Sequence, residues 1–97
     1  MALTFGEGPK GIDSNSLEMP FFGQDGDKYV ECRISHRVLM NYFGAKGTTK
    51  KEMLPAFEKN RQRIEEIARR KYDRGNFQQK PDRILVNLGP DDFRLMS

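Results

Sequence analysis

Cys32 and His36 are the residues whose types could support nucleophilic or metal chemistry, since the sequence holds one cysteine and one histidine. A Cys–His pair can supply a thiolate nucleophile, or two of the ligands that a zinc ion needs. Their spacing fits a helix, but it spans the end of a predicted strand and the start of a predicted helix. Cys32 also falls on the predicted inner face of its strand, where burial raises a thiol pKa and makes the group unreactive. We therefore predict no metal site, no cofactor and no catalytic cysteine.

Two pairs of carboxylates, Asp25 with Asp27 and Asp91 with Asp92, could serve in acid–base chemistry. Such chemistry needs two carboxyls in different environments across one pocket. Both pairs lie in predicted turns, where Asp is favoured because its short side chain bonds to the neighbouring backbone. We interpret both pairs as turn residues.

Arg61 falls within the apolar stripe predicted for a long helix, where a guanidinium must reach solvent or find a partner. One interpretation is an ion pair with a carboxylate such as Asp91 or Asp92. The other is an anion-binding arginine beside Tyr72, which together with the Asp91-Asp92 turn is where an unrecognised enzyme site would lie. No catalytic set accompanies these residues, so we favour the ion pair and predict a protein that is not an enzyme.

The long helix predicted over residues 50–74 carries nine Lys or Arg and five Asp or Glu, so its charge is +4 and the rest of the chain carries −1. Clusters of Lys and Arg are what phosphate binding requires, which makes this helix a candidate nucleic-acid surface. The pairs Glu65–Arg69 and Glu66–Arg70, however, have the order and spacing that favour salt bridges along a solvated helix face. We favour the solvated face. The residues of the candidate binding surface are Lys59, Arg61, Arg63, Arg70 and Tyr72.

The elements that position these residues begin with a predicted hairpin. Segments 16–22 and 29–34 each alternate apolar and polar residues, the period of a strand with one buried face. Asp25-Gly26 lies in the predicted turn between them, and Pro20 places the first strand at a sheet edge or at a bulge. The predicted inner-face residues are Leu17, Met19, Phe21, Val30, Cys32 and Ile34.

Two helices are predicted after the hairpin. Ser35 and Gly44 are typical of the N-terminal and C-terminal caps of a first helix. The capping box Thr49–Glu52 begins the second, over residues 50–74, and Pro55 predicts a kink or a short preliminary turn in it. The apolar stripe of this helix comprises Met53, Leu54, Phe57, Ile64, Ala68 and Tyr72.

A short strand before Gly6 and a last strand over 83–88 complete the order β-β-β-α-α-β, with a final turn at residues 91–93. Clustered strands and clustered helices predict a two-layer α+β fold, an antiparallel sheet of three to four strands with two helices on one face. The chain has 97 residues and 36% apolar residues, which indicates a single domain with a lean core. We expect a loosely structured strand and linker over 1–15 and the α+β core over 16–97.

The stretch from Asp27 to Phe93 resembles a small bacterial family catalogued as Domain of Unknown Function 1488. The resemblance lies in a set of short patterns, and the first 26 residues match only loosely. It implies a two-layer α+β domain, and some members carry a transcriptional-regulator label. The patterns are Cys32-Arg33-Ile34-Ser35, Tyr42-Phe43-Gly44-Ala45, Phe57, Arg61, Ile64, Ala68, Tyr72, Ile84-Leu85-Val86 and Asp91-Asp92-Phe93.

Composition and sequence set the remaining expectations. No stretch approaches the roughly 20 apolar residues of a membrane span, and the N-terminus does not have the pattern of a signal peptide. A single cysteine fits a reducing compartment, so we expect a cytoplasmic protein without membrane partners. Our leading hypothesis is a non-catalytic accessory module that binds another protein or forms a homodimer. The alternative is a nucleic-acid-binding or transcription-regulatory protein that uses helix 50–74.

Overall fold

The fold is α+β, a five-stranded mixed sheet with four helices, in a computed structural model that describes residues 3–6, 18–47 and 49–94. The predicted linker over 7–15 and the predicted strand start at 16–17 lie outside the described residues. In chain order the elements are β1 (Thr4–Phe5), β2 (Glu18–Asp25), β3 (Lys28–Ser35), α1 (His36–Phe43), α2 (Lys50–Lys59), α3 (Arg61–Asp73), β4 (Gln78–Gln79), β5 (Ile84–Leu88) and α4 (Pro90–Phe93).

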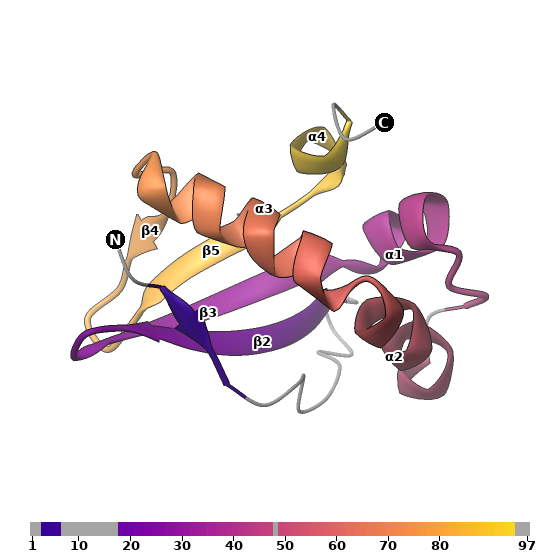
Figure 1. Cartoon of the computed structure of the whole chain (residues 1–97), viewed down its shortest axis with the longest axis horizontal. Coiled ribbons are helices and arrows are strands. Elements are labelled where there is room, and N and C mark those ends of the chain that lie inside the picture. Colours follow the sequence, from indigo (N-terminus) through magenta and orange to yellow (C-terminus); the bar gives the residue numbers. More distant parts are fainter. Residues whose placement is uncertain (1–2, 7–17, 48, 95–97) are drawn as a thin grey trace.

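The sheet has the strand order β1-β2-β3-β5-β4 (Figure 1). β1 pairs with β2, β2 with β3, and β4 with β5, all antiparallel, while β3 and β5 are parallel. The predicted all-antiparallel sheet of three to four strands is therefore wrong in its pairing and in its strand number. The predicted element order also lacks β4 and treats α2 and α3 as one helix. The clustering of strands and helices along the chain indicates the fold class but does not determine which strands become neighbours.

The parallel pair arises because the helices carry the chain back along the sheet. β3 ends at Ser35, and α3 then crosses the sheet toward the end where β3 begins (Figure 1). β5 consequently starts beside the start of β3, with Val30 opposite Ile84 and Ile34 opposite Leu88. This return is the helical crossover that parallel strands require.

One face of the sheet, which we call the inner face, is buried beneath α3. Val30, Cys32 and Ile34 of β3 are fully buried, as the alternation predicted, and alternate residues of β5 join them in the core. The Phe57 ring of α2 lies 5.1 Å from the Phe21 ring of β2. The predicted helix stripe is confirmed: Met53, Phe57, Ile64, Ala68 and Tyr72 are buried, and Leu54 is partly buried against the core.

The predicted caps are confirmed. Ser35 Oγ accepts from the Arg37 backbone N–H at 3.2 Å, and Gly44 ends α1 in the left-handed region at φ 77°. Thr49 Oγ1 accepts from the Glu52 backbone N–H at 3.3 Å, one half of the capping box that begins α2. These local signals fix where α1 and α2 begin and where α1 ends.

The helix predicted over 50–74 is interrupted at Asn60. Pro55 lies inside α2, and the break comes five residues later, where Asn60 has φ −115° and ψ 19°. The Asn60 side-chain amide donates to the Ala56 carbonyl at 2.9 Å, replacing the backbone bond that a continuous helix would make there. A side chain that competes with its own backbone thus ends α2 and begins α3.

β1 pairs with the edge of β2 that faces away from β3, next to Gly23. A Cβ atom at Gly23 would lie 2.6 Å from the Thr4 carbonyl oxygen, so glycine permits this close approach. Pro20 lies further along β2, where no described strand pairs with its outer edge. The Phe22 carbonyl accepts from Gly6 on the β1 side, and alternation puts the missing N–H of Pro20 on that same side. Among the described strands, Pro20 thus lies at an edge, as predicted.

The substitution Gly23→Ala is expected to displace β1 from the sheet. The alanine Cβ would also lie 3.1 Å from the Phe5 ring, so either the backbone of β1 or this ring must shift. We expect the free energy of unfolding, measured by urea titration, to fall by about 1–3 kcal/mol. Gly6→Ala is the matched control, because a Cβ there meets nothing within 4 Å. Equal effects of the two substitutions would contradict the close approach.

Candidate binding surface

Arg61 bonds to Glu65 of its own helix and to the N-terminal segment. Its Nε lies 2.6 Å from Glu65 Oε2, and its Nη2 donates to the Gly6 carbonyl. The hydrogen bond with Glu65 raises the Arg61 pKa above its ordinary value, so this group stays charged. Neither the predicted ion pair with Asp91 or Asp92 nor a position beside Tyr72 is observed. Arg61 and Tyr72 share a helix face but lie eleven residues apart, about 16 Å along the axis.

Arg69 makes a second contact with the N-terminal segment. Its Nε donates to the Leu3 carbonyl at 3.0 Å, and its guanidinium lies 5.4 Å from the centre of the Phe5 ring. The predicted pair of Arg69 with Glu65 is not observed, because Glu65 bonds to Arg61. Two arginines of α3 thus hold the backbone on either side of β1, a role that their sequence positions did not indicate.

Three other residues of the predicted surface, Lys59, Arg63 and Arg70, have exposed side chains. Arg70 Nη2 lies 2.8 Å from Glu66 Oε1, which confirms the predicted salt bridge along a solvated face. Lys59 and Arg63 are exposed, one at the end of α2 and the other in the first turn of α3. Of the five predicted residues, Lys59, Arg61 and Arg63 line one pocket at the junction of α2 and α3, and Arg70 and Tyr72 lie apart from it.

Tyr72 is buried at the end of α3 and ties it to the hairpin. Its hydroxyl donates to Asp25 Oδ2 at 2.5 Å, and its ring stacks on Phe77 with centroids 5.2 Å apart. Burial, and then the hydrogen bond with Asp25, raise the Tyr72 pKa to about 12. Asp25 is thus more than a turn residue, because it accepts a hydrogen bond from a distant helix.

Asp92 also has a partner that the sequence did not indicate. Lys71 Nζ lies 2.9 Å from Asp92 Oδ2 and donates to the Asn87 carbonyl. Asp92 Oδ2 in turn accepts from the Gly89 backbone N–H at 2.9 Å, so the carboxylate caps α4 as a turn residue would. Asp91, which is exposed, pairs with Arg94. Arg61, Tyr72 and Asp92 therefore belong to three separate contacts.

Cys32 lies on the inner face of β3, as predicted. Burial raises its thiol pKa to about 12, which leaves the thiol protonated at neutral pH. Within residues 3–6, 18–47 and 49–94, no group of three or more His, Cys, Asp or Glu side chains could hold a metal ion. No helix in the same ranges is long and apolar enough to span a membrane.

The opposite face of the sheet, which we call the outer face, contains none of the buried core residues. It is formed by the alternate residues of the long strands that point away from α3, and their side chains are partly or fully exposed. Sequence alternation places these residues opposite the core, but it does not show that no described helix covers them. On β2 and β3 the outer-face residues include Glu18, Pro20, Phe22, Tyr29, Glu31 and Arg33.

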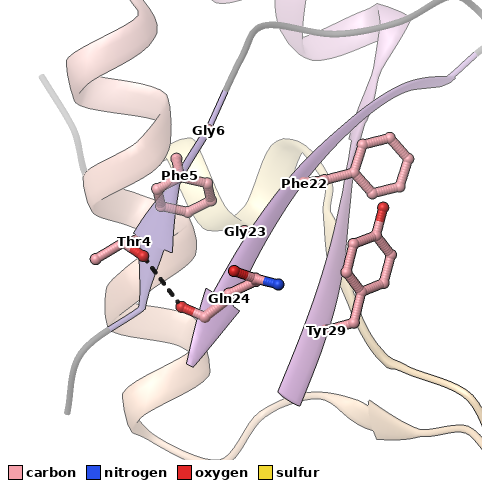
Figure 2. Close-up of a pocket in the computed structure, with 7 residues that line it drawn as sticks. All are labelled: Thr4, Phe5, Gly6, Phe22, Gly23, Gln24 and Tyr29. Carbon is pink, nitrogen blue, oxygen red and sulfur yellow. Dashed lines mark hydrogen bonds between the residues drawn. The ribbon is translucent and has the colours of Figure 1, made fainter. Parts of the chain in front are cut away.

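An aromatic pair lies at one corner of the outer face. The Phe22 and Tyr29 rings stack with centroids 5.5 Å apart and an interplanar angle of 20°, and Tyr29 is 44% exposed. They line a pocket of about 330 Å³ together with residues of β1 and β2 (Figure 2). Thr4 Oγ1 donates to the Gln24 carbonyl across this pocket at 3.4 Å. The pocket has an aromatic wall and neutral polar groups, but no charged side chain lines it.

Residues 3–84 match a family model described as "Protein of unknown function (DUF1488)". The match includes β1 and β2, which the sequence resemblance covered only loosely, and ends at the first residue of β5. The Asp91-Asp92-Phe93 pattern lies beyond it. No curated protein and no solved structure matches the chain.

The substitution Tyr72→Phe tests the contact between α3 and the hairpin. We expect it to lower the unfolding free energy by about 1.5–3 kcal/mol at neutral pH, because a hydrogen bond to a carboxylate is lost. The Tyr72 pKa is raised on folding from 10.0 to about 12, so this stabilisation is complete below pH 10 and is lost as the pH rises toward 12. In urea titrations the difference between the two proteins should narrow over that range. The raised pKa of Cys32 affects the stability of both proteins equally, so its effect cancels in the difference. A difference in unfolding free energy that stays constant with pH would contradict the raised pKa of Tyr72.

The substitution Arg69→Gln tests the hold on β1. It removes the bond to the Leu3 carbonyl and the contact with Phe5, so we expect unfolding free energy to fall by about 1–2 kcal/mol. Amide hydrogen exchange at Thr4 and Phe5 should quicken more than exchange in β3. Arg63→Gln, an exposed position on the same helix, is the matched control and should change neither measurement. Equal behaviour of the two variants would show that Arg69 does not hold β1.

Proposed function

The chain belongs to the DUF1488 family of proteins of unknown function, and we propose that it is a non-catalytic module that binds another protein through the outer face of its sheet. The observation that carries this proposal is the contrast between the two faces. One is buried beneath α3, and the other presents the stacked pair Phe22 and Tyr29 with no described helix over it. Exposed aromatic residues beside a pocket are typical of protein interfaces.

The chemistry of the titratable groups supports a role without catalysis. The Cys32 thiol is buried and its pKa is raised to about 12, so it would be a poor nucleophile. Two of the carboxylates considered for acid–base chemistry, Asp25 and Asp92, are engaged by Tyr72 and Lys71. A catalytic carboxylate must contact its substrate, whereas these two carboxylates hold elements of the fold together.

The contacts of the basic helices favour a protein partner over nucleic acid. Arg61, Arg69, Arg70 and Lys71 each bond to a carboxylate or a backbone carbonyl of this chain. Cations that already have protein partners contribute less to phosphate binding, since new contacts must replace old ones. Nucleic-acid binding is therefore our second proposal, and the exposed side chains that would support it are Lys51, Lys59, Arg63 and Arg74.

Site-specific crosslinking in the cell of origin tests the proposal. A photoreactive benzophenone side chain in place of Tyr29 should yield a discrete protein adduct on irradiation. Adding Phe22→Ala to the same chain should weaken that adduct. The matched control carries the photoreactive group at Arg63, which is exposed on α3, and should give no adduct.

Two results would overturn this ranking of the two proposals. One is the absence of any protein adduct from Tyr29. The other is retention of mixed duplex DNA at low salt by the wild-type chain, with a salt dependence that Lys59→Ala and Arg63→Ala reduce. That second result would favour the basic helices as the functional surface.

A further inference from the structure

Four charged side chains form a continuous row across the outer face, which we call the charge row. Along it the residues are Glu18, Arg33, Glu31 and Arg83, with alternating sign. Arg33 lies 3.7 Å from Glu18 and 3.1 Å from Glu31, and the other oxygen of Glu31 lies 2.8 Å from Arg83. The row runs diagonally over β2 and β3 to the residue before β5.

From this pattern we infer that the outer face binds a second copy of this chain, face to face, with the charge row setting the register. The inference rests on the proposed function and names the partner. A two-fold axis that lies between the two faces, perpendicular to the row, reverses the order of charges in the second copy. Glu18 then faces Arg83 of the second copy, and Arg33 faces its Glu31. The row is thus complementary to itself in this arrangement.

The same axis brings the aromatic residues together. Phe22 is the cross-strand neighbour of Glu31 and lies beside the middle of the row. Residues near the axis face their own counterparts in a two-fold dimer, so Phe22 of one copy would lie close to Phe22 of the other. Apolar contact there supplies affinity, and the charges mainly supply orientation, because each charge already has a partner within its own chain.

The charge and size of the outer face agree with this partner. The row carries two positive and two negative side chains, so it offers no net attraction to phosphate. Asp82 also contacts Arg83, but it is not one of the four residues of the charge row. It lies in the loop before β5, and its side chain is 75% exposed. The five strands at normal spacing give roughly 400 Å² of flat surface per copy, below the 800 Å² or so of a standard interface. We therefore expect a concentration-dependent dimer.

Charge reversal at the two ends of the row tests the inference. In Glu18→Arg and in Arg83→Glu, like charges would face each other in a homodimer, so each variant should dimerise at least roughly tenfold more weakly than wild type. In an equimolar mixture of the two variants every facing pair is opposite in sign, and a heterodimer should form with near wild-type affinity. Sedimentation velocity over a concentration series, with one variant fluorescently labelled, measures both effects.

Controls separate this inference from misfolding. Circular dichroism of each variant establishes that it is folded, and a heterodimer in the mixture cannot arise from unfolded chains. Lys59→Glu reverses an exposed charge outside the row and should leave the wild-type dimer unchanged.

Two results would overturn the inference. A wild-type chain that stays monomeric at all concentrations excludes the second copy as partner, yet an adduct between Tyr29 and another protein would still support the proposed function. A wild-type dimer that neither reversal weakens, or that the mixture does not restore, excludes the charge row as its contact.

Discussion

Parallel strands cannot be joined by a tight turn, because the chain must return to the end of the sheet where the first strand began. In this protein the pairing of β3 with β5 imposes that return on residues 36–83. α3 makes most of it, and in crossing the sheet it covers one face with Ile64 and Ala68. The division into a buried inner face and an exposed outer face follows from this one pairing.

The cations of α3 hold this crossover in position. β1 pairs with β2 over only two residues, too few for backbone ladder bonds alone to keep a strand in place. Arg61 and Arg69 add bonds to the carbonyls of Gly6 and Leu3 on either side of it. Lys71, close to Arg69 in the last turns of α3, bonds to Asp92 and secures α4. Much of the positive charge on this helix therefore stabilises the fold, which weakens the link between a basic chain and a nucleic-acid partner.

Local features of the fold could be predicted from the sequence, whereas contacts between distant segments could not. Ser35, Gly44 and the Thr49–Glu52 box act within a few residues, so their roles can be recognised without knowing the fold. The parallel pairing of β3 with β5 depends on where three helices lead the chain, which no short pattern encodes. The break at Asn60 was missed because Pro55 is the stronger helix breaker, yet proline is tolerated within α2 while the Asn60 amide competes for the Ala56 carbonyl.

The candidate site shows the same limit. The position of Arg61 in an apolar stripe correctly indicated that it needs a partner, but Gly6 is distant in sequence and became its neighbour only through the fold. The outer face could be derived by alternation, since Tyr29, Glu31 and Arg33 lie opposite the core residues of β3. Its ion pairs could not, because Arg83 reaches Glu31 only when β3 and β5 are adjacent.

An open sheet face must remain compatible with water while keeping enough order to recognise a partner. The ion pairs of the charge row serve the second demand, since each charge is held in position by a partner in its own chain. Pro20 at the outer edge of β2 limits strand-to-strand association, because it cannot donate a backbone bond to an incoming strand. Association through the edge is thereby disfavoured relative to association through the face. In the proposed dimer, the arrangement of charge and proline would direct association toward the surface where Phe22 and Tyr29 lie.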